Sequence, residues 1–247
     1  MRFPHLHLRF HIMKAWFMKT IPYHVVLFPD GNRRWAKEKG LPALKGHWEG
    51  YKNLLKFCRW CQKRGVKVIT AFGFSTENWD RSKREVSYLM KLLERGISDK
   101  SHVKDLQKYK VKVKIIGQKK RLPESLQKAI TRIEALTKNN NELQLNLAIS
   151  YGGRWDIVQA VQQIVRKKIP SPKITEELIT NHLSTAGLPD PDLIIRPGGE
   201  RRLSNFVLWQ GAYSELYFCE KYWPAFTEKD LDEAIREYAQ RNRRFGQ

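Results

Sequence analysis

Cysteine is scarce in this sequence, and acidic residues are heavily outnumbered. Only Cys58, Cys61 and Cys219 occur in 247 residues, and such an odd, low count without a secretory signal argues against a disulfide framework and for a reducing cytoplasm. No run approaches about 18 apolar residues, so no segment is predicted to span a membrane. Asp and Glu number 25 against 46 Lys and Arg, which leaves a formal charge of +21. This excess predicts an anionic partner: nucleic acid, an anionic membrane surface or a phosphate-rich substrate.

Several widespread catalytic motifs are missing as well. The sequence has no G-x-x-x-x-G-K-[ST] phosphate loop, no G-x-G-x-x-G dinucleotide fingerprint and no G-x-S-x-G nucleophile elbow. Cys58-x-x-Cys61 is a weak metal signal, because it falls on the apolar face of a predicted helix and no second cysteine pair completes a zinc site. We interpret this pair as core packing, with metal or redox chemistry as the alternative.

What is present is the pattern of one α/β domain. Hydrophobic residues make up 41% of the chain, a globular composition. Apolar runs predict strands at 23–28, 66–72, 111–117, 143–150, 192–197 and 214–219. Helical patterns between them cover 46–65, a helix opening at a Ser82–Glu85 capping box, 123 to about 137, a helix marked by Val158, Val161 and Val165, and a last helix opening at Thr227. The alternation predicts a mainly parallel central sheet of about six strands flanked by helices.

The first 17 residues differ in character from the rest. They are basic and aromatic and contain no acid. We interpret residues 1–17 as a flexible extension ahead of Met18, with a membrane-surface anchor as the alternative.

Unusual polar segments follow four of the predicted strands, at 30–34, 73–81, 151–156 and 196–205. In open parallel sheets, ligands bind beyond the carboxyl ends of the strands. Glycines there let backbone N–H groups approach a ligand, and arginine forks grip phosphate oxygens. The composition of these segments therefore predicts an anion cradle. Asp30, after the first strand, is suited to hold Mg²⁺ against a diphosphate; the alternative is an N-cap for the helix that follows.

Six segments of the chain resemble, in order, the signature segments of the cis-prenyltransferases, the undecaprenyl diphosphate synthase family. They are DGNRRWA (30–36), GH (46–47), FSTENWDR (74–81), YGGRWDI (151–157), IIRPGGERRLSNF (194–206) and WQGAYSELYF (209–218). The resemblance extends from about Tyr23 to Gly246, which makes 18–247 the expected catalytic domain. The absence of any adjacent Asp pair agrees with the cis family, since trans-prenyl synthases carry D-D-x-x-D motifs. Within YGGRWDI, we favour a structural interpretation, in which Gly152 and Gly153 turn a strand into a helix capped by Asp156.

The resemblance implies a Mg²⁺-dependent enzyme that condenses isopentenyl diphosphate with an allylic diphosphate, such as farnesyl diphosphate. The product would be a cis-polyprenyl diphosphate, the lipid carrier precursor for cell-wall glycan synthesis. It also implies roles for individual residues: Asp30 as the metal and diphosphate aspartate; Gly31, Asn32, Arg33, Arg34, Trp35 and His47 for the allylic diphosphate; Asn78 in proton removal; Ser75, Thr76, Glu77, Trp79 and Arg81 around the reacting end; Arg196, Arg202, Leu203 and Ser204 for isopentenyl diphosphate; and Glu215 as a second metal ligand near a dimer interface.

Three positions depart from the family pattern. Ala43 stands where the family usually has an arginine, Pro29 where it has Met, and Ala225 where an aspartate often occurs. The presence of Asp30 and the RRFG ending favour an active homodimer in the cytoplasm, with peripheral association at the membrane surface as a further interpretation. A basic nucleic-acid-binding protein and a catalytically silent partner subunit are the rival hypotheses.

Tyr51 bears on product length. It lies one helical turn after His47, on the same face. A phenol ring there would fill space that a growing chain needs, which favours a product shorter than the family's usual one, whereas Gly73 leaves room. The alternative is that Tyr51 merely packs in the core.

Overall fold

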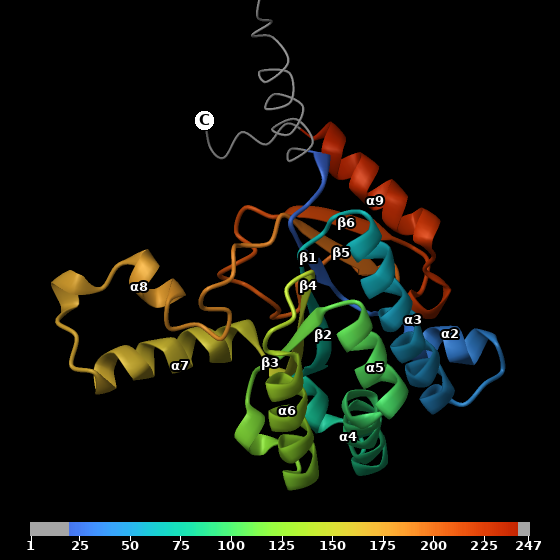
Figure 1. The fold of residues 1–247 in the computed structure, drawn as a ribbon, viewed down its shortest axis with the longest axis horizontal. Helices are drawn as coiled ribbons and strands as arrows, with labels where there is room; N and C mark the ends of the chain where they lie inside the picture. Colours follow the sequence, from blue (N-terminus) through green and yellow to red (C-terminus); the bar gives the residue numbers. More distant parts are fainter. Residues whose placement is uncertain (1–19, 242–247) are drawn as a thin grey trace, which may run out of the picture.

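The computed structural model describes residues 20–241, so the expectations for residues 1–17 and for the C-terminal ending lie outside the described residues. A sheet of six strands runs through the domain, in the order β3-β4-β2-β1-β5-β6 (Figure 1). Every neighbouring pair is parallel. The strands are β1 His24–Leu27, β2 Val68–Ser75, β3 Val111–Ile116, β4 Leu143–Tyr151, β5 Leu193–Pro197 and β6 Glu215–Cys219. The predicted α/β class and parallel sheet are confirmed.

Helices cover both faces of this sheet, as the alternating pattern predicts. They are α2 Asn32–Glu38, α3 Ala43–Lys63, α4 Lys83–Ser98, α5 Lys100–Lys108, α6 Glu124–Thr137, α7 Gly153–Arg166, α8 Glu176–Thr180 and α9 Glu228–Gln240. Short 3₁₀ turns lie at Thr76–Asp80, Lys119–Arg121, Ser171–Lys173 and Trp223–Ala225. The sequence pattern did not predict α5 or α8 as separate helices. Between residues 20 and 241, no helix is both long and apolar enough to cross a membrane.

The central strand β1 lies at the middle of the core, and all four of its residues are buried. One apolar cluster joins β1 to α3 through Phe57, to the 3₁₀ turn Trp223–Ala225 through Trp223, and to α9 through Leu231. A second packs α4 and α6 on the sheet through Leu89 and Leu126. Cys58 and Cys61 belong to the first cluster, and burial raises the pKa of both thiols. The prediction that this pair serves core packing is confirmed.

The valines that mark α7 in the sequence lie on its exposed side. Val158, Val161 and Val165 are 53%, 45% and 67% exposed. The helix instead buries Gly153, Asp156, Ala160 and Ile164, and with α8 it projects from the body of the domain (Figure 1). The prediction of a helix marked by these valines is confirmed, and the structure places the valines at the surface.

Asp156 also has a different role from the predicted helix cap. Gly152 and Gly153 do turn β4 into α7, but no side chain caps this helix. The buried Asp156 carboxylate instead accepts hydrogen bonds from the Tyr151 hydroxyl at 2.9 Å and from the Ser184 backbone N–H at 2.8 Å. Asp156 therefore links the loop that contains Ser184 to the start of α7.

Candidate active site

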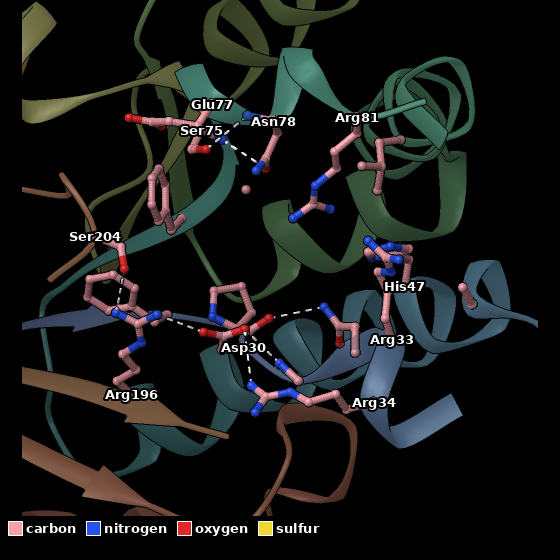
Figure 2. Close-up of a pocket in the computed structure, with 18 of the residues that line it drawn as sticks. Asp30, Arg33, Arg34, His47, Ser75, Glu77, Asn78, Arg81, Arg196 and Ser204 are labelled. Carbon is pink, nitrogen blue, oxygen red and sulfur yellow. Dashed lines mark hydrogen bonds and ion pairs between the residues drawn. The ribbon is translucent and has the colours of Figure 1, made fainter. Parts of the chain in front are cut away.

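A cavity of about 1110 Å³ lies at the carboxyl ends of the central strands (Figure 2). The exits of β1, β2 and β5 meet there, because parallel strands end at the same edge of the sheet. Its wall brings together most of the residues predicted from sequence: Asp30, Gly31, Asn32, Arg33, Arg34, His47, Ser75, Glu77, Asn78, Arg81, Arg196 and Ser204.

Asp30 lies at the centre of this cavity, in the turn between β1, which ends at Leu27, and α2. Its Oδ2 accepts a hydrogen bond from Arg196 Nη2 at 2.8 Å, and its Oδ1 accepts one from the Gly31 backbone N–H at 2.9 Å. The alternative role as an N-cap is wrong, since Gly31 occupies that position and no side chain caps α2. Gly31 has φ +88°, and a Cβ there would meet Tyr222 Cδ1 at 2.5 Å, so the turn that presents Asp30 requires glycine.

Arg196, on β5, is a charged side chain that is only 3% exposed. Its Nη1 donates to Ser204 Oγ at 2.9 Å and to the backbone oxygen of Arg202, and its guanidinium lies 4.7 Å from the centre of the Phe28 ring. Arg196 Nε has no hydrogen-bond partner within the described structure. Burying a guanidinium is costly for stability. Its position is therefore better explained by anion binding than by packing.

A second group of basic side chains faces Asp30 across the cavity (Figure 2). Arg33 from α2, His47 from α3 and Arg81 from the loop after β2 converge there, and all three contact the carboxylate of Glu85 on α4. Burial lowers the pKa of His47 below its ordinary value, although Glu85 beside it acts in the opposite direction. His47 is consequently favoured in its neutral form when the cavity holds no anion.

The loop between β2 and α4 is held by a reciprocal cap. Ser75 Oγ accepts a hydrogen bond from the Asn78 backbone N–H at 3.2 Å, and Asn78 Oδ1 accepts one from the Ser75 N–H at 3.1 Å. Partial burial opposes the charged form of Glu77, but hydrogen bonds led by that from Asn205 outweigh it and lower the pKa of this carboxyl. The loop thus presents an oriented amide and an anionic carboxylate to the cavity.

Comparisons with known proteins identify the family of this chain. Residues 28–246 match the sequence model of the family described as "Putative undecaprenyl diphosphate synthase". This chain belongs to that family. The isoprenyl transferases of Fusobacterium nucleatum and Thermotoga maritima are 48% and 47% identical to it, each over 92% of this chain and 97% of the relative. The protein is accordingly an isoprenyl transferase, an enzyme that transfers prenyl groups.

Solved structures agree with this assignment. Lavandulyl diphosphate synthase from Lavandula x intermedia, solved in complex with dimethylallyl diphosphate, superimposes with a TM-score of 0.88 at 40% identity, covering 92% of this chain and 99% of that one. A "probable undecaprenyl diphosphate synthase" from Campylobacter jejuni gives a TM-score of 0.76 at 34% identity, with the same coverage. The fold of this isoprenyl transferase is therefore that of its family.

Some residues that the family resemblance implied do not line the cavity. They are Trp35, Thr76, Trp79, Arg202, Leu203 and Glu215. Trp79 donates from Nε1 to Ser150 Oγ at 2.8 Å and packs on Phe74, so its ring belongs to the core. The Arg202 side chain is 61% exposed and pairs with Glu200 at 2.5 Å, and only its backbone oxygen reaches Arg196. Substrate binding by these side chains stays a prediction.

Glu215 lies at the opposite end of the sheet from Asp30. It begins β6 beside Leu193, the first residue of β5, and its carboxylate accepts a hydrogen bond from Arg241 Nη1 at 2.8 Å. Within residues 20–241, no group of three or more His, Cys, Asp or Glu side chains is placed to hold a metal ion. One chain therefore does not bring Glu215 and Asp30 to a common metal.

Glu85 is a partly buried acid beside the cavity whose contacts sequence reasoning missed. The predicted capping box is only half formed, with Ser82 Oγ accepting from the Glu85 backbone N–H at 3.3 Å. The Glu85 carboxylate turns instead to Arg81 Nη1, at 2.9 Å, and to His47. The capping pattern could have indicated Glu85 as a buried acid beside basic residues, but not where its carboxylate would point.

The apolar part of the cavity comes from aromatic rings and a glycine. Phe72 and Phe206 are stacked with ring centres 4.0 Å apart, and Phe72 and Gly73 both line the cavity. Tyr51 is not part of the wall. Its hydroxyl contacts His102 Nδ1 at 2.6 Å and its ring packs on Gly96. These contacts favour the core-packing interpretation of Tyr51 without measuring product length.

Proposed function

We propose that this cavity binds an allylic diphosphate and isopentenyl diphosphate together and joins them into a cis-polyprenyl diphosphate. The observation that carries the proposal is the ion pair of the buried Arg196 with Asp30, in a cavity walled by four further cationic side chains: Arg33, Arg34, Lys37 and Arg81. Several guanidinium groups on one cavity wall can bind the oxygens of a ligand with two phosphate groups. The related lavandulyl diphosphate synthase, which binds an allylic diphosphate, supports this choice.

The chemistry requires charge to be stabilised where a bond breaks. The allylic C–O bond breaks with its electron pair moving to the diphosphate, the double bond of isopentenyl diphosphate attacks the allylic carbon, and a proton then leaves the new chain. We assign Arg33 and Arg34, which line the cavity from α2, to the departing diphosphate, and Arg196 with its partner Ser204 to that of isopentenyl diphosphate. We assign the proton-removal step to the neighbourhood of Asn78, whose amide the Ser75 cap orients.

The residues present fit a magnesium ion. Mg²⁺ is usually bound through one or two carboxylates together with substrate phosphates, and Asp30 provides one carboxylate beside the cationic wall. Asn32, which lines the same cavity, keeps its buried Oδ1 without a partner within the described residues. When bound, the metal supplies positive charge to the leaving diphosphate. We assign Asp30 as its ligand, and Glu215 only through a second copy of the chain.

We also propose that the enzyme is a homodimer that packs through α7. An exposed row of large apolar side chains is unusual for a monomer surface, and Val158, Val161 and Val165 form such a row on a projecting helix. Val161→Asp is expected to convert the dimer to a monomer in analytical ultracentrifugation. Leu136→Asp, on the exposed face of α6, is the matched control and is expected to leave the mass unchanged. A wild-type monomer would contradict the proposal.

Peripheral membrane association is proposed on charge alone. The net charge of +21 favours anionic lipid surfaces. Sedimentation with phosphatidylserine vesicles, but not with phosphatidylcholine vesicles, is the expected result at low salt.

We propose that Tyr51 limits the length of the product. If the growing chain passes between α3 and α5, the hydrogen-bonded Tyr51–His102 pair closes its path. Tyr51→Ala is then expected to lengthen the product by one or more isoprene units, measured by chromatography of the dephosphorylated products. An unchanged product distribution would assign Tyr51 to packing only.

The direct test of the proposed function is turnover with radiolabelled isopentenyl diphosphate, Mg²⁺ and either farnesyl or geranyl diphosphate. Label is expected in long butanol-extractable products, and both primer preference and product size follow from the same assay. Salt-dependent retention on DNA without any turnover would favour the nucleic-acid-binding rival.

A further inference from the structure

Glu85 is the acidic partner shared by two guanidiniums and one imidazole of the cavity. Its carboxylate lies 2.9 Å from Arg81 Nη1, 3.3 Å from His47 Nε2 and 3.6 Å from Arg33 Nη1, and its side chain is only 14% exposed. These three groups come from different elements, whereas Glu85 lies on α4 behind them and is not itself part of the cavity wall.

The two sides of the cavity are neutralised by different acids. On the Asp30 side, Arg196 pairs with Asp30, while Arg34 pairs with Glu200 at 3.1 Å. On the opposite side, Glu85 is the one acidic partner that the described structure provides for Arg33 and Arg81. That second half of the cationic wall therefore depends on a single carboxylate.

We propose that Glu85 is a positioning residue that serves as the internal counter-charge of the diphosphate subsite and keeps diphosphate binding weak enough for release. The inference rests on the proposed function, because it takes the ligand of the cavity to be a diphosphate. In the empty cavity Glu85 holds the guanidiniums of Arg33 and Arg81 together against their mutual repulsion and contacts the neutral imidazole of His47. When a diphosphate binds, these groups acquire phosphate oxygens as partners and remain partly neutralised by the carboxylate behind them.

The sign of the effect separates this role from a purely structural one. A carboxylate behind the cations repels an incoming diphosphate, since like charges a few ångströms apart in a partly buried site interact strongly. Removal of that charge, with the hydrogen-bond acceptor retained, should therefore strengthen anion binding. If Glu85 only aligned the arginines, any substitution would weaken anion binding instead.

The experiment is calorimetric titration of the full chain with inorganic pyrophosphate, comparing the wild type with Glu85→Gln. The amide oxygen of glutamine can still accept a hydrogen bond from Arg81. Glu85→Gln is expected to bind pyrophosphate about tenfold more tightly, and to lower both KM for the allylic diphosphate and kcat, because the released pyrophosphate leaves more slowly.

Glu49→Gln is the matched control. Glu49 on α3 also pairs with two cations, Lys45 at 3.4 Å and Lys52 at 2.6 Å, and none of the three lines the cavity. This variant is expected to bind pyrophosphate within about twofold of the wild type. Equal strengthening in both variants would reduce the effect to net charge and overturn the role of Glu85.

Pyrophosphate binding by Glu85→Gln that is unchanged or weaker than in the wild type would also overturn the proposal. Should Glu85→Gln fail to fold, Glu85→Asp provides the test. The aspartate side chain is shorter by one methylene, so its charge lies farther from the cations, and pyrophosphate should bind about threefold more tightly. Failure of the wild type itself to bind pyrophosphate would contradict the proposed function, whereas wild-type binding without a Glu85 effect would contradict this inference alone.

Discussion

Asp30→Ala is expected to reduce prenyl transfer by about a thousandfold or more while leaving the fold intact. The carboxylate stands at the centre of the cationic cavity, where the diphosphate and its metal would lie. Its removal costs little packing because the side chain is partly exposed, and Arg196 keeps its hydrogen bond to Ser204. The measurement is kcat with both substrates saturating, together with the thermal unfolding midpoint.

Asp105→Ala is the matched control for this variant. Asp105 on α5 also pairs with an arginine, Arg59, but lies outside the cavity wall. It is expected to retain full activity, because a half-exposed ion pair contributes little to stability. Near-normal turnover in Asp30→Ala would refute the assignment of Asp30.

Arg196→Ala is expected to raise KM for isopentenyl diphosphate by about thirtyfold or more, and KM for the allylic diphosphate far less. A charge-assisted hydrogen bond to a ligand contributes roughly 2–3 kcal/mol, and Arg196 directs two nitrogens into the cavity region of Ser204 and Asp30. Arg196→Lys should restore only part of the loss, since an ammonium lacks the guanidinium fork. Steady-state kinetics with each substrate varied separately makes the comparison.

Arg202→Ala is the comparison within the same loop. Its side chain is exposed and paired with Glu200, so a smaller rise in KM is expected than for Arg196→Ala. Equal rises in both KM values in Arg196→Ala would contradict the assignment of this arginine to the isopentenyl diphosphate subsite.

Much of the fold could be predicted because local signals and tertiary packing agree. Apolar runs became strands, and the Ser82 and Thr227 caps begin α4 and α9 where expected. The meeting of Asp30 with Arg196, 166 residues apart, followed from one rule: parallel strands end at one edge. The family segments then indicated which residues at that edge carry the chemistry.

The remaining features depend on contacts that no local pattern records. The spacing of Val158, Val161 and Val165 predicts an apolar helix face but not which element packs on it. In this chain that face is exposed. The Glu85 carboxylate could cap α4 or pair with a cation. It pairs with Arg81, because that guanidinium lies beside it in the folded chain. Glu215 follows a strand signal correctly, yet the sheet places it at the end away from Asp30.

The most direct measurement is a crystal structure of the enzyme with Mg²⁺ and a non-reactive farnesyl thiolodiphosphate. The account predicts the diphosphate between Asp30 and the guanidiniums of Arg33 and Arg34, with the metal on the Asp30 carboxylate and the prenyl chain running past Phe72 and Gly73. A diphosphate bound elsewhere on the chain, with Asp30 still paired only to Arg196, would contradict it.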